Sequence, residues 1–513
     1  MTSSAGKLWS RREFLGTVAT ASAAVSLPGA LSAAGAKSSR PPNVLFIMSD
    51  DMRVELGCYG SRFRAQTPNL DALAKTAVRF DRNYCQFPLC NPSRASLLTG
   101  RRPTRTGVLG NRTGIRDAQP DWTSLPQLFR ENGYVSVRAG KIFHGGLDDP
   151  KAWNSSSGGR PEDEGGMQSP GAGHVLDTSQ IAERSERDLR SPKLAAPSAD
   201  ESVGRRRALY SDRIVVLEGN GEGHGDYLTA DRTIENLRKY KDQPFFIACG
   251  FVKPHSPPTA PQKFLDRYDV NDIKLPPDFA AWPTVPPGFP SAAIRPRNAD
   301  LFIGRGASEA EAKEVIRAYL ASISWVDWNI GRVLAELDRL GLRDNTIVVF
   351  VADHGYQLGE KGKWSKAGSL FEMGTRVPFI ISAPGMSGNG QSCSHIVESL
   401  DIYPTLVELC GLPPQKEIEG VSLVPLLKNP SANWDRPAYS VWSEDGKTLH
   451  GVAVRTEKWR YAEYGLDGKN GTMLLDPHDP DELKNLAGDE KYQSTVAELS
   501  ALARKYAASL GTT

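Results

Sequence analysis

Acidic side chains follow two apolar runs of the sequence, at the points where buried strands would end. Asp50 and Asp51 come after the run VLFIM and one serine, and Asp353 and His354 directly follow the run TIVVFVA. Because sites in open α/β sheets form beyond the carboxyl ends of the strands, these side chains could hold one cation. Each pair alone is as readily a turn or a helix cap. Their occurrence at equivalent ends of two strands favours a metal site.

The residue types leave the identity of this metal open. Carboxylate oxygens favour a hard cation such as calcium or magnesium. The imidazole of His354 is better suited to zinc or manganese. The residues alone therefore predict one divalent cation without naming it.

A third motif combines a cysteine with the start of a predicted helix. Cys90 opens the pattern C-x-P-S-R, which ends at Arg94 and is followed by Leu98-Thr99-Gly100-Arg101. A helix N-terminus attracts anions and lowers a thiol pKa, so a thiolate nucleophile is the first interpretation. From average residue usage, a chance match in a chain of this length has odds on the order of 10⁻³.

These motifs together resemble the signature of the type I sulfatases, in which the motif cysteine is oxidised to formylglycine. The two acidic segments match the metal-binding segments of that family. The resemblance covers nearly the whole chain after residue 36. Within the family, the sequence is most similar to the iduronate-2-sulfatase branch. The stretches that carry this similarity are Ala139–His144, Lys253–His255, Gly359–Glu360, Trp364–Lys366 and Asp401–Thr405.

The resemblance implies how the cysteine and the metal would act together. A formylglycine-generating maturation enzyme would oxidise Cys90, and the hydrate of the resulting aldehyde would supply the nucleophilic oxygen. One calcium ion per chain would be held by residue 90, Asp50, Asp51, Asp353 and His354. In this family the calcium also binds a sulfate oxygen.

The resemblance also implies roles for five further side chains. Arg94 would steady the formylglycine, and Lys141 and Lys366 would clamp the sulfate. His144 would assist at the nucleophile, and either His255 or Lys366 would protonate the leaving alcohol. The chemistry agrees, because cations neutralise charge that develops in the transition state and a general acid must serve the leaving oxygen.

Other interpretations of these residues remain open. Lys141 could be a solvated lysine, and His144 and His255 could be structural. A phosphonate monoester or phosphodiester hydrolase of the same fold can also use formylglycine. A catalytically inactive relative that binds sulfated glycans is a third possibility, but it would not need the complete set of side chains.

Regular elements must position these residues. The strongest helix is predicted at 308–340, where Ser308 and Glu311 form a capping box and Gly341 ends the apolar stripe. A shorter helix is predicted to begin with Thr67 as its N-cap. Further strands are predicted at 43–48, 134–139, 244–251, 346–352 and 377–382, helices at 124–132, 228–240 and 401–410, a long insertion or surface loop at 151–210, and no clear regular element at 253–307.

The alternation of apolar strands with amphipathic helices predicts a largely parallel sheet covered on both faces. After about residue 430, four short candidate strands and one helix predict a small antiparallel α+β domain. We therefore expect a catalytic domain at 37–430 and a C-terminal α+β subdomain at 431–513. The family resemblance implies the same α/β class, with an alkaline-phosphatase-like mixed, mostly parallel sheet flanked by helices.

The N-terminus resembles a twin-arginine export signal, because Arg11-Arg12 precedes a modestly apolar run at 18–34. That run is too weakly apolar for a stable membrane span. A small-residue cleavage site would start the mature chain near Lys37. We therefore predict a signal peptide at 1–36, recognition by the twin-arginine export machinery, and a periplasmic or secreted protein without stable membrane insertion.

The composition narrows the class of protein. The chain has 513 residues, of which 39% are hydrophobic and 24% charged, as in a soluble globular protein of at least two domains. A formal net charge of +2 gives no strong attraction to nucleic acid. The six cysteines are scattered, and their spacing does not indicate a disulfide framework. With the export signal and long loops, the resemblance predicts a sulfated carbohydrate as the substrate.

Overall fold

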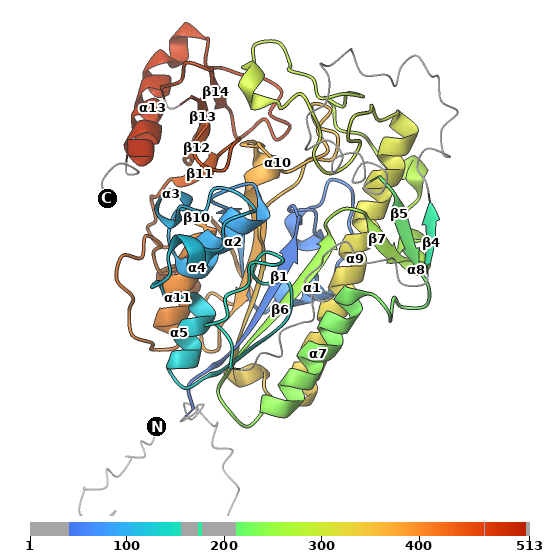
Figure 1. The fold of residues 1–513 in the computed structure, drawn as a ribbon, viewed down its shortest axis with the longest axis vertical. Coiled ribbons are helices and arrows are strands. Elements are labelled where there is room, and N and C mark those ends of the chain that lie inside the picture. Colours follow the sequence, from blue (N-terminus) through green and yellow to red (C-terminus); the bar gives the residue numbers. More distant parts are fainter. Residues whose placement is uncertain (1–39, 155–172, 177–211, 466, 509–513) are drawn as a thin grey trace, which may run out of the picture. The chain divides into compact units, whose positions relative to one another are not determined.

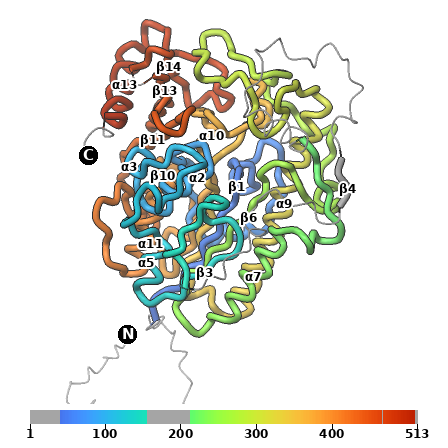
Figure 2. The backbone as a smooth tube through the Cα atoms, in the orientation of Figure 1, coloured from blue at the N-terminus to red at the C-terminus, as the bar shows by residue number. Residues whose placement is uncertain are grey.

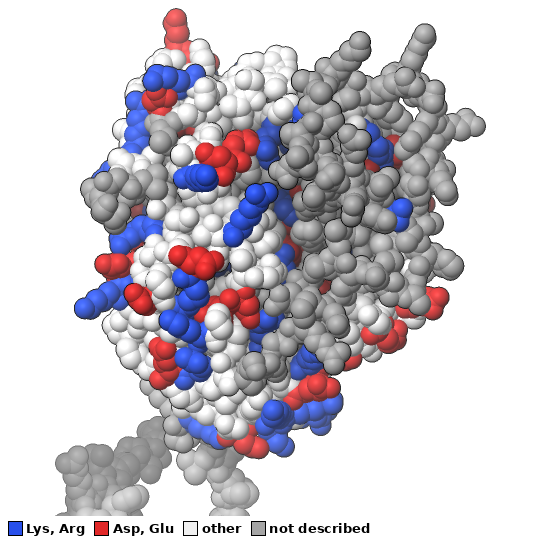
Figure 3. Space-filling view, viewed as in Figure 1, with Lys and Arg blue, Asp and Glu red and all other residues white. Residues whose placement is uncertain are grey.

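The computed structural model describes residues 40–154, 173–176, 212–465 and 467–508 of the chain (Figure 1). The predicted signal peptide at 1–36 lies outside the described residues, as does most of the predicted insertion at 151–210. Among the described residues, no helix is both long enough and apolar enough to cross a membrane. On the face shown in Figure 3, positive and negative side chains lie intermixed among the described residues.

A central sheet of seven strands has the order β10-β2-β9-β8-β1-β6-β3. β1 (Asn43–Asp50) runs parallel to β6 (Phe245–Pro254) on one side and to β8 (Thr346–Ala352) on the other. β3 (Val135–Gly140) is parallel to β6. Every residue of β1 is buried, as its uninterrupted apolar run predicts for a strand covered on both faces.

The other half of the sheet is mixed. β9 (Arg376–Ser382) runs antiparallel to both β8 and β2 (Val78–Tyr84). β10 (Ser392–Glu398) is parallel to β2 and ends the sheet order. The sequence did not predict β2 or β10, because charged and polar residues interrupt their apolar positions. The predicted mixed, mostly parallel sheet is confirmed.

Helices cover both faces of this sheet, because successive side chains of a strand point to opposite sides (Figures 1 and 2). Leu45 and Ile47 of β1 pack into one core, and Phe46 and Met48 pack into the other. Figure 2 shows α7 and α9 side by side along the first face. The first layer contains α1 (Pro68–Ala74), α7 (Gly225–Tyr240) and α9 (Glu309–Arg339), and the second contains α2 (Cys90–Thr99), α5 (Leu125–Glu131) and α11 (Ile402–Leu409).

The longest helix, α9, begins and ends as its sequence predicts. Ser308 Oγ accepts a hydrogen bond from Glu311 N at 3.3 Å, and Glu311 Oε2 accepts one from Ser308 N at 3.1 Å. Gly341 follows the helix with a φ of +66°, which a residue with a side chain rarely adopts. The predicted capping box is confirmed.

Thr67 occupies the predicted N-cap position of α1, but its side chain does not cap the helix. Thr67 precedes α1, but its hydroxyl donates to Asp71 at 3.0 Å instead of capping the first turn. That turn is capped by Asp327 of α9, whose carboxylate accepts from Asn69 N at 3.2 Å and Leu70 N at 2.8 Å. A carboxylate from another helix therefore replaces the local cap that the sequence pattern indicates.

The C-terminal region contains a second sheet, which is antiparallel and has the order β11-β12-β13-β14. One helix, α13, packs on it. These elements confirm the predicted small α+β part, while its boundary at residue 430 stays a prediction. Their bounds are β11 (Ala438–Trp442), β12 (Gly451–Arg455), β13 (Arg460–Tyr464), β14 (Thr472–Leu475) and α13 (Gln493–Ala508).

The Pro-rich segment at 253–307 holds short elements, contrary to the prediction of none. They are too short for a periodic sequence signal. β7 (Thr259–Pro261) pairs with β5 (Ile214–Leu217), which also pairs with β4 (Gly173–Leu176) in a third sheet.

The remaining short helices are η1 (Gly57–Tyr59), α3 (Pro103–Thr106), α4 (Ile115–Ala118), α8 (Gln262–Leu265), η4 (Val270–Asp272), η5 (Ser291–Ala293), η6 (Arg343–Asn345), α10 (Glu372–Thr375), η7 (Ser399–Asp401), α12 (Val424–Lys428) and η8 (Glu490–Tyr492).

Candidate active site at the ends of β1 and β8

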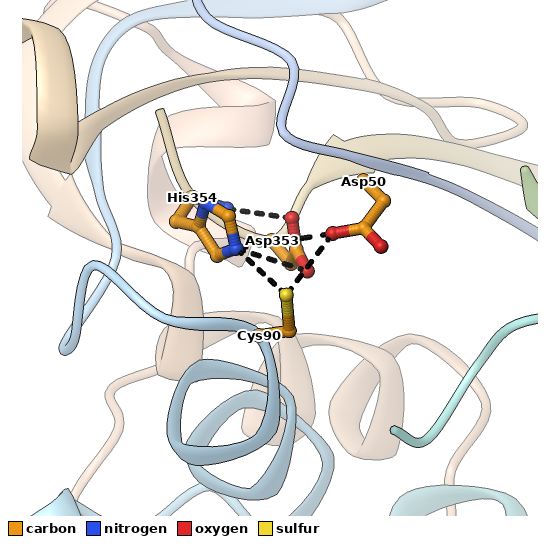
Figure 4. Close-up of side chains that lie close together, drawn as sticks. All are labelled: Asp50, Cys90, Asp353 and His354. Carbon is orange, nitrogen blue, oxygen red and sulfur yellow. Dashed lines mark hydrogen bonds and ion pairs between the residues drawn. The ribbon is translucent and has the colours of Figure 1, made fainter. Parts of the chain in front are cut away.

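The acidic residues predicted from the two strand ends lie together in the structure. Asp50 ends β1, and Asp353 and His354 follow β8, its parallel neighbour. Figure 4 shows these three side chains converging on the thiol of Cys90. Cys90 Sγ lies 3.3 Å from Asp50 Oδ1 and 3.2 Å from His354 Nε2. One donor atom of each of the four residues lies within 4.8 Å of the others, and Asp51, Cys90 and His255 form a second such group.

Cys90 begins α2, as predicted, and the spacing of its motif has a direct structural reason. Residues three and four positions apart share one face of a helix. Ser93 accordingly donates its hydroxyl hydrogen to the Asp353 carbonyl, and Arg94 Nε donates to Asp353 Oδ2 at 2.8 Å. The pattern C-x-x-S-R therefore aims three side chains from the first turn of one buried helix at the end of β8.

Arg94 connects two parts of the site. Its side chain is fully buried, and its Nη1 donates to the carbonyls of Lys141 at 2.8 Å and Ile142 at 2.9 Å. Its Nη2 lies 3.7 Å from Asp50 Oδ1. A guanidinium offers several donors in a fixed plane. Arg94 can therefore compensate buried acids and hold the segment after β3 at the same time.

The two predicted clamp lysines are buried ion-pair partners. Lys141 donates to Asp50, and Lys366 Nζ lies 2.9 Å from both carboxylate oxygens of Asp51 and 3.5 Å from Asp300. Their exposed fractions are 7% and 3%, so the interpretation of Lys141 as a solvated lysine is wrong. Both ammonium groups lie beside the proposed metal ligands.

Gly140 and Gly250 allow the close approach that places Lys141. Gly140 has a φ of +70°, and a Cβ atom there would lie 2.1 Å from the Gly250 carbonyl oxygen. A Cβ atom on Gly250 would lie 2.0 Å from the Lys141 carbonyl oxygen. Any side chain at either position would force β3 and β6 apart and move Lys141 away from Asp50.

Asp51 has a left-handed backbone conformation, with a φ of +61°. Such a conformation is uncommon for a residue with a side chain, so other contacts must hold it. The Tyr319 hydroxyl donates to the Asp51 carbonyl at 2.7 Å, and Asp51 N donates to Asp353 Oδ1 at 3.2 Å. Burial raises the pKa of the Asp51 carboxyl well above its usual value, although Lys366 opposes this.

The two predicted histidines have different surroundings. His255 Nδ1 lies 2.8 Å from the Ser256 carbonyl oxygen, an acceptor that fixes Nδ1 as the protonated nitrogen and leaves Nε2 for chemistry. His144 is half-buried and lines a small cavity with Lys141. Among the described residues, His144 Nδ1 has no hydrogen-bond partner, and burial with nearby Lys141 lowers the pKa of His144 to about 3.

Three supporting residues were not predicted from the sequence. Tyr319 lies in the apolar stripe of α9, where nothing distinguishes it from a core residue. Asp300 lies in the Pro-rich segment and accepts from the Ser365 hydroxyl at 3.0 Å. Asp226 lies two residues after His224, in a glycine-rich segment. His224 caps α7, because its Nδ1 accepts from Asp226 N at 3.1 Å.

The donor set fits a hard divalent cation. Three carboxylates, from Asp50, Asp51 and Asp353, and one imidazole, from His354, surround the side chain of residue 90. All four of these side chains are buried, and carboxylate oxygens are the ligands that calcium prefers.

Comparison with known proteins identifies relatives along most of the chain. Residues 42–412 match the family model described as Sulfatase, and residues 359–508 match the model described as N-sulphoglucosamine sulphohydrolase, C-terminal. A protein named sulfatase from Formosa agariphila is 33% identical over 481 residues, which cover 90% of this chain and 86% of the relative. Iduronate 2-sulfatase from Homo sapiens is 31% identical over 413 residues, which cover 72% of this chain and 69% of the relative.

A solved structure confirms the predicted alkaline-phosphatase-like fold. The phosphonate monoester hydrolase of Agrobacterium radiobacter superimposes with a TM-score of 0.67 at 23% identity. The superposition covers 91% of this chain and 96% of that one. At this sequence identity the likeness shows a shared fold and says nothing about the substrate.

Proposed function

The chain belongs to the sulfatase family and is a sulfuric ester hydrolase, and on this premise we propose that it removes sulfate from a carbohydrate, with a formylglycine at residue 90 and one calcium ion. The observation that carries the proposal is the convergence of Cys90 with Asp50, Asp353 and His354 at the ends of two parallel strands. The surrounding carboxylates and imidazole can share one cation with the side chain of residue 90. An oxygen nucleophile that also ligates a cation suits the same surroundings.

In the proposed site, residue 90 and the side chains of Asp50, Asp51, Asp353 and His354 would hold the calcium. When bound, the calcium supplies charge neutralisation for the sulfate group, and the formylglycine hydrate supplies the attacking oxygen and a second hydroxyl for release of sulfate.

The lysines and Arg94 bind and orient. Lys141 pairs with Asp50 and Lys366 with Asp51, and their ammonium groups would bind sulfate oxygens. Arg94 donates to Asp353 and to the carbonyls of Lys141 and Ile142, so it fixes the geometry around residue 90. These cations make the site complementary to an anion that ordinarily repels nucleophiles.

Two histidines would move protons. His144 would take a proton at the nucleophilic oxygen, because it lies half-buried beside Lys141. In its doubly protonated form, His255 would deliver the Nε2 proton to the leaving alcohol, while its Nδ1–H stays bonded to the Ser256 carbonyl. Lys366 is the weaker candidate for this acid, because it bonds both oxygens of Asp51.

A carbohydrate sulfate is the substrate class that the relatives favour. One relative is named iduronate 2-sulfatase, and the family model over residues 359–508 is named for an enzyme of N-sulphoglucosamine. The test is kcat/KM for sulfated oligosaccharides beside choline sulfate, a steroid sulfate, aryl sulfates and an aryl phosphonate monoester. Preference for a non-carbohydrate sulfate would contradict the substrate class, and preference for the phosphonate would contradict the sulfatase reaction itself.

Maturation and export complete the proposal. A formylglycine-generating enzyme would act on Cys90, and the twin-arginine machinery would carry the protein to the periplasm or beyond. A peptide mass spectrum across residue 90 tests the first step, because an aldehyde must replace the thiol. Replacement of Arg11 and Arg12 by Lys tests the second, and undiminished export of that variant would contradict it.

A further inference from the structure

A bulge in β6 places His255 beside the metal-binding group. Ser49 of β1 pairs with Phe251, but the next residue, Asp50, pairs with Pro254. Two residues of β6, Val252 and Lys253, are therefore left without a partner in β1. Such an insertion bends a strand and redirects the side chains that follow it. Without the extra residues, His255 would not reach the end of β1.

The bulge leaves two backbone N–H groups that need acceptors, because buried donors are almost always paired. Both are satisfied by one side chain, Asp226. Its Oδ1 accepts from Val252 N at 2.9 Å, and its Oδ2 accepts from Lys253 N at 2.8 Å. The exposed fraction of Asp226 is 1%, so water does not compete for these bonds.

The carboxylate of Asp226 is free for this task because another residue caps its helix. Asp226 is the second residue of α7, where an acid would ordinarily serve the helix N-terminus. His224 provides that cap through Nδ1 and packs its ring on Trp325, with centroids 5.0 Å apart. In this segment, His224 caps α7, and the carboxylate of Asp226 bonds to the backbone of β6.

Four further hydrogen bonds fix the turn that carries the histidine. Ser49 Oγ donates to the Lys253 carbonyl at 2.7 Å. Lys253 Nζ donates to the carbonyls of His255 and Pro257, both at 2.8 Å. His255 N itself donates to the Val252 carbonyl at 3.0 Å. The position of His255 therefore depends on the bulge, and the bulge depends on Asp226.

We propose that Asp226 is a positioning residue for the reaction: its two carboxylate oxygens hold the β6 bulge and so keep His255 within reach of the leaving oxygen. This inference rests on the proposed role of His255 as the general acid. Asp226 acts through the backbone of Val252 and Lys253 alone.

The test uses Asp226→Asn in the matured, calcium-loaded enzyme. The amide keeps one acceptor but turns a donor toward the second N–H group, which breaks one of the two bonds. A displaced general acid slows the expulsion of poor leaving groups most, because good leaving groups depart without a proton. We expect kcat to fall about 10-fold to 100-fold for a sugar sulfate, the range that follows from a displacement of about 1 Å. For 4-nitrophenyl sulfate we expect kcat to change less than about 3-fold, because its phenol needs little protonation.

Three comparisons make the result specific. His255→Ala should show the same leaving-group dependence, larger in size, and the double variant should be no slower than His255→Ala alone. Asp327→Asn is the matched control, because Asp327 is also a buried carboxylate that accepts two backbone N–H groups, at α1 instead of β6. It should lose stability and keep the wild-type leaving-group dependence. If Asp226→Asn does not fold, Lys253→Met tests the same turn by removing the bonds to His255 and Pro257.

The outcomes separate the two ideas. If His255→Ala shows leaving-group dependence and Asp226→Asn slows all substrates equally, as a structural defect would, the positioning role is overturned and the proposed function stands. If His255→Ala itself affects good and poor leaving groups alike, the acid role of His255 fails, and the positioning role fails with it. A double variant much slower than His255→Ala would show that Asp226 acts by another route and would also overturn the inference.

Discussion

The hydroxyl of Tyr319 donates to the backbone carbonyl of Asp51 at 2.7 Å, and Asp51 is the residue with the left-handed backbone. The same hydroxyl accepts from Arg53 N at 3.1 Å. Tyr319 is 2% exposed and comes from the middle of α9. One phenol on the longest helix therefore fixes the turn after β1 that presents Asp51 to the site.

Tyr319→Phe should weaken metal binding. Without the hydroxyl, Asp51 can relax from its left-handed conformation and Arg53 N loses its acceptor. Residues that orient metal ligands are worth about 10-fold to 100-fold in metal affinity. We expect calcium affinity to fall within this range, measured by titration of the metal-free variant. Tyr403→Phe is the control, because its buried hydroxyl donates to the Thr123 carbonyl at 3.1 Å; an equal loss of affinity there would contradict the role of Tyr319.

Cys90→Ala should abolish turnover. Removal of a covalent nucleophile ordinarily lowers kcat by roughly 10⁶-fold, since the remaining groups can only bind and orient. The control is Cys393→Ala in β10, which removes another buried thiol and should keep near-normal kcat. Steady-state assays with a sulfated sugar give both values. Turnover of Cys90→Ala within about 10-fold of wild type would rule out a nucleophile at residue 90.

The sequence predicts the side chains that meet at the site better than the residues that hold them in position. Asp50 and Asp353 were paired correctly because parallel neighbouring strands must bring their carboxyl ends together. Tyr319 and Asp226 escaped prediction for a physical reason. Each acts through backbone groups more than 20 residues away in sequence, and that contact exists only after α9 and α7 have packed on the sheet. The cap of α1 failed in the same way, since Asp327 comes from another helix.

Removal of calcium should lower both activity and stability. A ligand that binds only the folded state stabilises it by about 3 kcal/mol at 100 times its Kd. We therefore expect a chelator to lower the Tm and abolish turnover, and added calcium to restore both. Asp353→Ala should lose this response. Asp278→Ala is the control, because Asp278 pairs with Lys361 at 2.7 Å, apart from the proposed ligands, and should keep the response. Restoration by zinc instead of calcium would contradict the assignment of the metal.

A carboxyl pair, in which Glu482 is buried and Glu372 half-buried, makes the stability of the fold depend on pH. Glu372 and Glu482 share the guanidinium of Arg460 in β13, and Glu482 Oε1 lies 3.1 Å from Arg460 Nε. Burial raises the pKa of Glu482 to about 7; Arg460 and Lys361 oppose the rise, and Glu372 adds to it. Burial likewise disfavours the charge of Glu372, but Arg460 and Arg455 outweigh burial and lower the pKa of Glu372 to about 2. Glu372 is therefore the carboxylate that pairs with Arg460, and Glu482 is the carboxyl that retains its proton.

The sign of the pH effect follows from the raised pKa of Glu482. Between its ordinary value of 4.5 and about 7, folded Glu482 retains a proton that the unfolded chain has released. Its contribution to stability is complete below 4.5 and is lost as the pH rises through about 7. A shift of this size corresponds to about 3 kcal/mol. Relative to Glu482→Gln, which cannot ionise, the wild type should therefore lose up to that amount of unfolding free energy between pH 4.5 and 8. Denaturant unfolding of both proteins across this range measures the difference, and parallel pH profiles would show that Glu482 does not titrate there.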